Sequence, residues 1–69
     1  MKSFGKNLRR LRNSKGLSME QFAFDSNMEY RHLGRIERGE INTTISTVLV
    51  LAKALDVEVS ELFKFKFSV

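Results

Sequence analysis

Two helix starts separated by a bend lie within residues 18 to 38, and this arrangement constrains the fold more than any other feature. Ser18 and Gln21 have the spacing of a capping box, which marks the start of the first helix. Asn27 tolerates the left-handed conformation that ends a helix. Glu29 then stands at the N-cap of the second helix, although it is a weaker cap than Ser. The sequence therefore predicts a helix-turn-helix in these residues.

The second helix of this pair, predicted over residues 30 to 37, separates apolar from basic positions. Leu33 and Ile36 fall on the inward face. The outward face is expected to carry Tyr30, Arg31, Gly34, Arg35 and Arg38. A solvated surface helix often has such a face, but a basic helix placed after a tight bend is also how small proteins read the major groove of DNA.

Charge is distributed unevenly along the chain. Residues 1 to 39 contain nine Lys or Arg and four Asp or Glu (+5), and residues 40 to 69 contain three and four (−1), which gives the net charge of +4. The half that carries the bend is thus the basic half. Double-stranded DNA would be attracted to it through neutralised phosphates and released counterions.

The composition excludes several classes of protein. A chain of 69 residues is expected to form a single domain, residues 1 to 69, which buries only about 60 % of its unfolded surface and gains from a partner subunit. There is no cysteine, no apolar run of signal-peptide length and no membrane-spanning segment, so we expect a cytoplasmic protein without disulfides. With His32 as the single histidine, we expect no metal, no cofactor, no small-molecule ligand and no enzymatic activity.

Three further helices complete an all-α fold of five helices. The first is predicted from Lys2 or Ser3 to Lys15, with Gly16 as its C-cap. The fourth is predicted over residues 45 to 55, with Thr44 as its N-cap. A short last helix is predicted from Ser60 to about residue 64, followed by a short extended tail of alternating charge and aromatic residues.

The helix over residues 45 to 55 is more apolar than a small core requires. Its inward stripe is expected to be Ile45, Val48, Leu49, Ala52 and Leu55. Val50 and Leu51 would widen the apolar surface, which suggests a partner. We therefore expect a two-fold dimer through residues 45 to 69, with an interface made by Val50, Leu51, Phe63, Phe65 and Phe67. The alternative is that Phe65 and Phe67 fold back on their own domain.

Three segments in order carry a resemblance to a known family: Leu17-Ser18-x-Glu20-x-Phe22-Ala23, Ile36-Glu37-Arg38-Gly39 and Leu51-Ala52-Lys53-Ala54-Leu55. With them, residues 4 to 63 resemble the phage-repressor (Cro/C1, or Xre) helix-turn-helix family. The pairing of Ser26-Asn27-Met28-Glu29 with Asn42-x-Thr44-Ile45 is similar to the small controller proteins of restriction-modification systems.

The resemblance implies roles for several side chains. Arg12 and Glu37 would form a structural ion pair between the first helix and the end of the recognition helix. Phosphate contacts carried over by position are Ser18, Gln21, Arg38, Asn42, Thr43 and Thr44, and we add His32 as a phosphate neighbour. Departures from the family are Met19, where a glutamine is common, Gly34, where a polar reader is common, and Phe24, at a usually polar position.

Candidate base readers follow from side-chain chemistry. Arg31 and Arg35 carry guanidinium forks that match the O6 and N7 acceptors of guanine. Tyr30 would touch a thymine methyl group or a phosphate, and Glu29 would either cap the helix or accept from a cytosine amino group.

These roles together predict a transcriptional regulator that binds a pseudo-palindromic operator in double-stranded DNA as a homodimer. Its two recognition helices would lie about 34 Å apart, one turn of DNA. The alternative is a DNA-binding antitoxin or protein-interaction module that pairs with a different protein.

Overall fold

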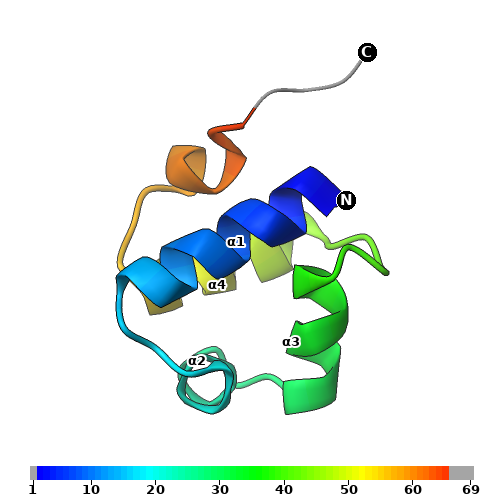
Figure 1. Ribbon diagram of the computed structural model, residues 1–69, viewed down its shortest axis with the longest axis vertical. Coiled ribbons are helices and arrows are strands. Elements are labelled where there is room, and N and C mark those ends of the chain that lie inside the picture. Colours follow the sequence, from blue (N-terminus) through cyan, green and yellow to red (C-terminus); the bar gives the residue numbers. More distant parts are fainter. Residues whose placement is uncertain (1, 66–69) are drawn as a thin grey trace.

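The computed structural model describes residues 2–65, which form four α-helices and one 3-10 helix (Figure 1). The elements are α1 (Lys2–Ser14), α2 (Met19–Asp25), α3 (Tyr30–Glu37), α4 (Ile45–Leu55) and η1 (Val59–Phe63). The all-α prediction is confirmed, but the predicted fifth helix is only a 3-10 turn. It begins at Val59 instead of after Ser60, and Glu58 at its N-cap makes no side-chain capping bond.

Local capping chemistry sets the helix boundaries. Ser18 Oγ accepts from the backbone N–H of Gln21 at 3.0 Å, and Thr44 Oγ1 accepts from that of Thr47 at 3.2 Å. The Gln21 side chain donates to Asp25 instead of reaching back to Ser18, so only half of the capping box forms. Asn27 ends the α2 segment with φ of 52°, as predicted. The starts of α2 and α4 therefore follow from their cap residues.

Glu29 corrects one part of this prediction. It occupies the N-cap position of α3 with extended backbone angles, but its carboxylate makes no capping hydrogen bond. The Glu29 side chain therefore does not cap the backbone N–H groups at the start of α3.

The core lies where α1 packs against α3, η1 and the other helices. In Figure 1, α1 passes across α4, with η1 on one side and α2 and α3 on the other. Every helix contributes buried apolar side chains: Phe4, Leu8, Leu11, Phe22, Ala23, Leu33, Ile36, Val48, Leu51, Ala52, Leu55 and Leu62. Buried Asn7 joins α1 to η1, because its amide donates to the backbone carbonyls of Glu61 and Leu62 at 2.8 and 2.9 Å.

Gly5 allows α1 to approach α3 closely. A Cβ atom at this position would lie 2.6 Å from the carbonyl oxygen of Ile36, which is closer than real Cβ contacts. The backbone of α1 therefore rests on the last turn of α3 and fixes where that turn lies.

The inward face of α4 differs from the prediction. Leu51 is fully buried, at 0 % exposure, whereas Ile45 is 76 % and Leu49 53 % exposed. The inward stripe consists of Val48, Leu51, Ala52 and Leu55. Leu51 therefore belongs to the core and is not an interface residue. The exposed apolar surface of α4 is Ile45, Leu49 and Val50, which we call the α4 face.

The aromatic residues after α4 pack on their own chain. The Phe63 ring lies 5.2 Å from that of Phe4 and 6.3 Å from that of Phe65, between centroids. Phe63 and Phe65 are partly buried against the core, and for Phe65 this favours the alternative that it folds back on its own domain. Phe67 and most of the predicted extended tail lie outside the described residues.

Candidate nucleic-acid interface

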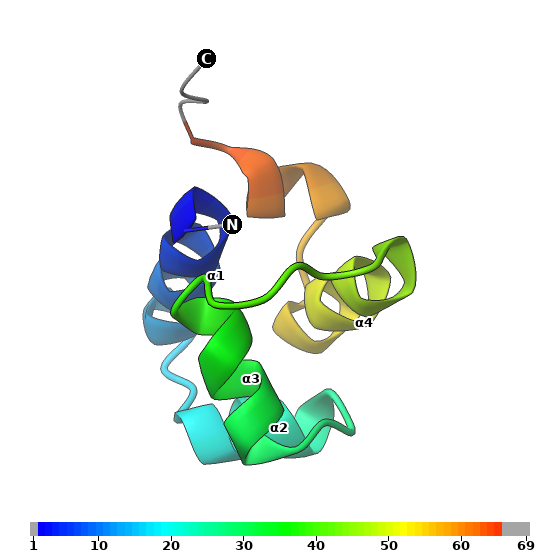
Figure 2. The same ribbon diagram turned by 90° about the vertical axis from the view of Figure 1, so that its right-hand side faces the viewer.

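Helix α3 stands on one face of the molecule, in front of α2 when viewed as in Figure 2. The turn before it is fixed by Asn27, and Leu33 and Ile36 anchor it in the core. The predicted base readers on this helix remain accessible, and they are Tyr30, Arg31 and Arg35, with Glu29 just before them. His32 is also exposed. The helix therefore offers a row of polar and cationic side chains to solvent.

Gly34 is predicted on this outward face, but the structure buries it. The side chains of Arg38 and Met19 cover it: a Cβ at Gly34 would lie 3.0 Å from Nη1 of Arg38 and 3.5 Å from Cε of Met19. The reason is that the long Arg38 side chain extends back along α3, over the space that Gly34 leaves.

Glu40, for which the sequence predicted no role, forms ion pairs with Arg35 and Arg38 through its exposed carboxylate. Arg38 Nε donates to Glu40 Oε2 at 2.6 Å, and Arg35 Nε lies 3.8 Å from Glu40 Oε1. The hydrogen bond to Glu40 raises the pKa of Arg38, and the same bond from Arg38 lowers the pKa of Glu40. Both groups are solvent-exposed, so this pairing is open to displacement by another anion.

The predicted phosphate contacts lie at the two ends of this surface. Ser18 and Gln21 are exposed at the start of α2, and Asn42 and Thr44 are exposed before α4. Thr43 does not fit the same role, because its hydroxyl oxygen is buried and has no hydrogen-bond partner among the described residues. The sequence alone does not reveal that this hydroxyl oxygen is covered.

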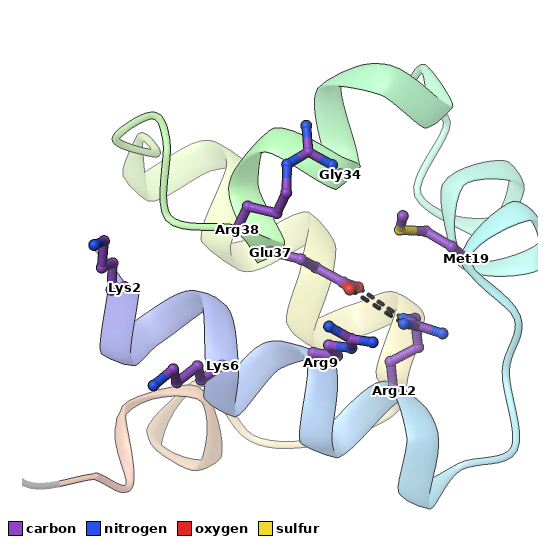
Figure 3. A pocket seen from close by; sticks show the side chains of 8 residues that line it. All are labelled: Lys2, Lys6, Arg9, Arg12, Met19, Gly34, Glu37 and Arg38. Atoms are coloured by element: carbon purple, nitrogen blue, oxygen red, sulfur yellow. Dashed lines mark hydrogen bonds and ion pairs between the residues drawn. The ribbon is translucent and has the colours of Figure 1, made fainter.

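The Arg12 and Glu37 side chains meet between α1 and α3. Arg12 Nε and Nη2 donate to the two carboxylate oxygens of Glu37 at 2.7 and 3.2 Å, and Nη1 donates to the Leu17 carbonyl at 2.9 Å. Their side chains are only 11 % and 4 % exposed. The pair, drawn with dashed lines in Figure 3, thus ties the end of α3 to α1.

Two other kinds of site are not found in residues 2–65. No group of three or more His, Cys, Asp or Glu residues is placed to hold a metal ion in this part of the chain. Over the same residues, every helix is too short or too polar to cross a bilayer.

Comparisons with known proteins agree with this arrangement. A helix-turn-helix family profile matches residues 8–62. The chain is 45 % identical over 56 residues to control protein C.SmaI of Serratia marcescens, covering 81 % of this chain and 67 % of that protein. It is 33 % identical over 63 residues to control protein C.BamHI of Bacillus amyloliquefaciens, covering 90 % and 78 %.

A solved structure is similar over almost the whole chain. The restriction-modification controller protein C.AhdI from Aeromonas hydrophila superposes with a TM-score of 0.87 at 47 % identity, covering 90 % of this chain and 94 % of that one. The predicted resemblance is thereby confirmed. This family consists of DNA-binding transcription regulators and is not a family of enzymes. The chain belongs to the helix-turn-helix family of Cro/C1 (Xre) type.

Proposed function

We propose that this protein regulates transcription by binding a pseudo-palindromic operator as a homodimer, with one α3 helix in each of two successive major grooves. The observation that carries the proposal is the exposure of Tyr30, Arg31 and Arg35 on a helix held by the core and by the Arg12–Glu37 pair. A rigid helix with solvent-exposed side chains can bring guanidinium forks to base edges.

Within this proposal, Arg31 and Arg35 read guanine, each at about 1–3 kcal/mol of discrimination for a bidentate contact. Tyr30 contacts a thymine methyl group or a phosphate. Glu29 is a candidate acceptor for a cytosine amino group, since its carboxylate makes no capping bond. These four side chains determine sequence preference.

Phosphate contacts on either side of α3 set the register of the protein on the duplex. On one strand they come from the start of α2, through Ser18 and Gln21. On the other they come from the segment before α4, through Asn42 and Thr44, while Arg38 adds charge between them and His32 lies beside a phosphate. Each of these side chains is exposed.

The α4 face supplies the dimer contact in this proposal. Ile45, Leu49 and Val50 are 76 %, 53 % and 42 % exposed, and leaving such large apolar side chains in water is unfavourable. This surface replaces the one expected from the sequence, which included Leu51, and it keeps Val50. Two copies joined through it would present two α3 helices related by a two-fold axis.

The names of the relatives extend the proposal to a biological setting. C.SmaI and C.BamHI are control proteins, and C.AhdI is a restriction-modification controller. We infer that this protein controls genes of a restriction-modification system.

Selection of bound duplexes from a random DNA pool tests the proposed function. The expected product is a sequence with two-fold symmetry and half-sites about one helical turn apart. Arg35→Ala should then weaken binding to the selected operator and relax preference at one base pair in each half-site. Arg38→Ala should weaken binding to operator and random DNA alike. A pool with no enriched sequence, or equal losses for Arg35→Ala on both DNAs, overturns the proposal.

A second candidate function is supported by Phe24, which is 81 % exposed on α2. Together with the α4 face, it favours an antitoxin or protein-interaction module that pairs with a different protein. Analytical ultracentrifugation separates the two candidates. A homodimer supports the regulator, and a monomer that associates only with another polypeptide supports the interaction module.

A further inference from the structure

A groove runs between α1 and the last turn of α3, beside the start of α2 (Figure 3). Its lining is mostly basic and consists of Lys2, Lys6, Arg9, Arg12, Met19, Gly34, Glu37 and Arg38. None of the proposed base readers lines it. It is therefore a surface distinct from the exposed row on α3.

Positive charge in this groove is poorly compensated. Five of the lining residues are cationic and one is a carboxylate, Glu37. That carboxylate is already bound by Arg12 through two hydrogen bonds. Among residues 2–65, Lys2, Lys6 and Arg9 have no hydrogen-bond or ion-pair partner for their side chains. These three cations are free to bind an external anion.

The spacing of the free cations fits an extended anion better than a single ion. Lys2, Lys6 and Arg9 stand at positions i, i+4 and i+7 on one face of α1, which spans about 10 Å along the helix axis. Each DNA strand carries a phosphate about every 3.4 Å of helix axis, so a row about 10 Å long can contact more than one phosphate of a sugar-phosphate backbone. A lone small anion would engage only part of the row.

The walls of the groove support the same ligand. Gly34 carries no side chain, and a Cβ atom there would lie 3.0 Å from Nη1 of Arg38 and 3.5 Å from Cε of Met19. The α2 residue that lines the groove is Met19, whose side chain has no hydrogen-bond donor for a phosphate. The contacts to an anion must therefore come from the α1 cations and Arg38. Since Met19 directly follows Ser18, the groove continues the proposed phosphate track at the start of α2.

We propose that Lys2, Lys6 and Arg9 bind phosphodiester groups of one DNA strand in this groove, beyond the segment read by α3. The inference rests on the proposed function for the identity of the polyanion, and it adds a phosphate-binding row on α1. These contacts carry no base preference and raise affinity for all duplexes.

The test compares two variants of the full chain that lose the same charge. Lys6→Ala/Arg9→Ala removes two groove cations, and Lys15→Ala/Lys53→Ala removes two exposed cations outside it. Binding to a random duplex and to the selected operator is measured by fluorescence anisotropy over a series of salt concentrations. Circular dichroism melting verifies that each variant is folded, and Lys6→Gln/Arg9→Gln replaces the alanine variant if it is not.

The groove variant is expected to bind both duplexes more weakly by the same factor. The slope of log K against log salt should become shallower by about 0.9 for each phosphate that the variant no longer binds, and the control should keep the wild-type slope. A folded groove variant with the wild-type slope, or a control with the same change, overturns the proposal.

Phosphate neutralisation locates the groove-bound phosphate on the DNA. A single methylphosphonate is placed at successive positions of the duplex, which removes one negative charge at a time. Wild type and the Lys15→Ala/Lys53→Ala control should lose affinity when the groove-bound phosphate is neutral, whereas the groove variant should be insensitive there. Equal sensitivity of both variants at every position contradicts the inference.

The two proposals fail in different ways. If wild type shows no preferred sequence, the operator proposal fails, but the salt slope on random duplex still decides the groove. If wild type prefers an operator and the groove variant keeps its slope, the groove proposal alone fails.

Discussion

Replacing Glu37 by alanine removes the carboxylate that holds the Arg12 guanidinium between α1 and α3. Two of the three hydrogen bonds that Arg12 donates disappear, those at 2.7 and 3.2 Å, and the bond to the Leu17 carbonyl remains. The Arg12 side chain is 11 % exposed, so water reaches it poorly. Glu37→Ala therefore leaves a charged group buried without its counter-ion.

The cost is large compared with the stability of so small a protein. Removing one partner of a buried pair costs about 3–5 kcal/mol, and the residual exposure of Arg12 places this case near the lower bound, about 3 kcal/mol. A chain of 69 residues has a total free energy of unfolding of about 3–10 kcal/mol. The variant should therefore lose between about a third and all of its free energy of unfolding.

Urea unfolding followed by far-ultraviolet circular dichroism measures this cost. With a slope of about 1 kcal/mol per molar urea, the midpoint should fall by about 3 M. Glu58→Ala serves as the control, because Glu58 is exposed and makes no capping bond, and its stability should change by less than about 0.5 kcal/mol. Arg12→Met/Glu37→Met removes both charges and should recover most of the lost stability.

A loss below about 1 kcal/mol for Glu37→Ala, at an unchanged slope, would refute this reasoning, because a stranded buried charge costs more than that. It would mean that the guanidinium is hydrated in the folded protein. A double variant less stable than Glu37→Ala would refute it as well, since the penalty would then not arise from the stranded charge.

Three further sets of outcomes follow from other parts of the structure. Gly5→Ala should lower the free energy of unfolding by about 1–3 kcal/mol in thermal melts, because the added Cβ would lie 2.6 Å from the Ile36 carbonyl oxygen. Glu40→Gln should tighten binding to random and operator DNA alike in anisotropy titrations, because it frees Arg38 and Arg35 from a competing carboxylate. In a nuclear magnetic resonance titration, the pKa of Glu40 should lie below its ordinary value of 4.5 and rise in Arg38→Ala. A carboxyl group whose pKa is lowered in the folded protein stabilises the fold at pH values above its ordinary pKa. This contribution is lost as the pH falls through the pKa of the folded state. The proposed dimer contact through the α4 face predicts that wild type sediments as a dimer and that Leu49→Asp sediments as a monomer at the same concentration.

Helix boundaries were predictable where a single side chain decides them. Ser18 and Thr44 accept the N–H groups expected of N-caps, and Asn27 adopts the left-handed conformation. These hydrogen bonds join residues a few positions apart, so no knowledge of the tertiary fold is needed. The boundaries of α4, residues 45 to 55, were predicted correctly for this reason.

The inward face of α4 was not predictable in the same way. Ile45, Leu49 and Leu51 are all apolar, so periodicity favours more than one face over these residues. The packing of α4 against η1 and the rest of the core places Leu51 inward and leaves Leu49 exposed. That decision depends on residues far apart in sequence.

The site was partly predictable for a related reason. The sequence predicts which residues of the site lie on α3, and it also predicts the exposure of Tyr30, Arg31 and Arg35. Glu40, however, reaches Arg38 and Arg35 only because the chain turns after α3, and Gly34 is buried only because Arg38 extends over it. Both facts arise from side-chain directions, which a helical pattern does not contain.

The last turn of α3 joins stability to the proposed DNA contacts. Glu37 and Arg38 are consecutive, so the bonds that tie Glu37 to Arg12 also hold the backbone from which Arg38 extends, beside the groove between α1 and α3. An apolar pair in place of Arg12 and Glu37 would restore burial but not three directional hydrogen bonds. A displacement of α3 would move Arg35 and Arg38 together. The orientation of α3 is therefore the contribution of the ion pair that apolar packing would not replace. We therefore expect the buried ion pair to contribute more to positioning α3 than to net stability.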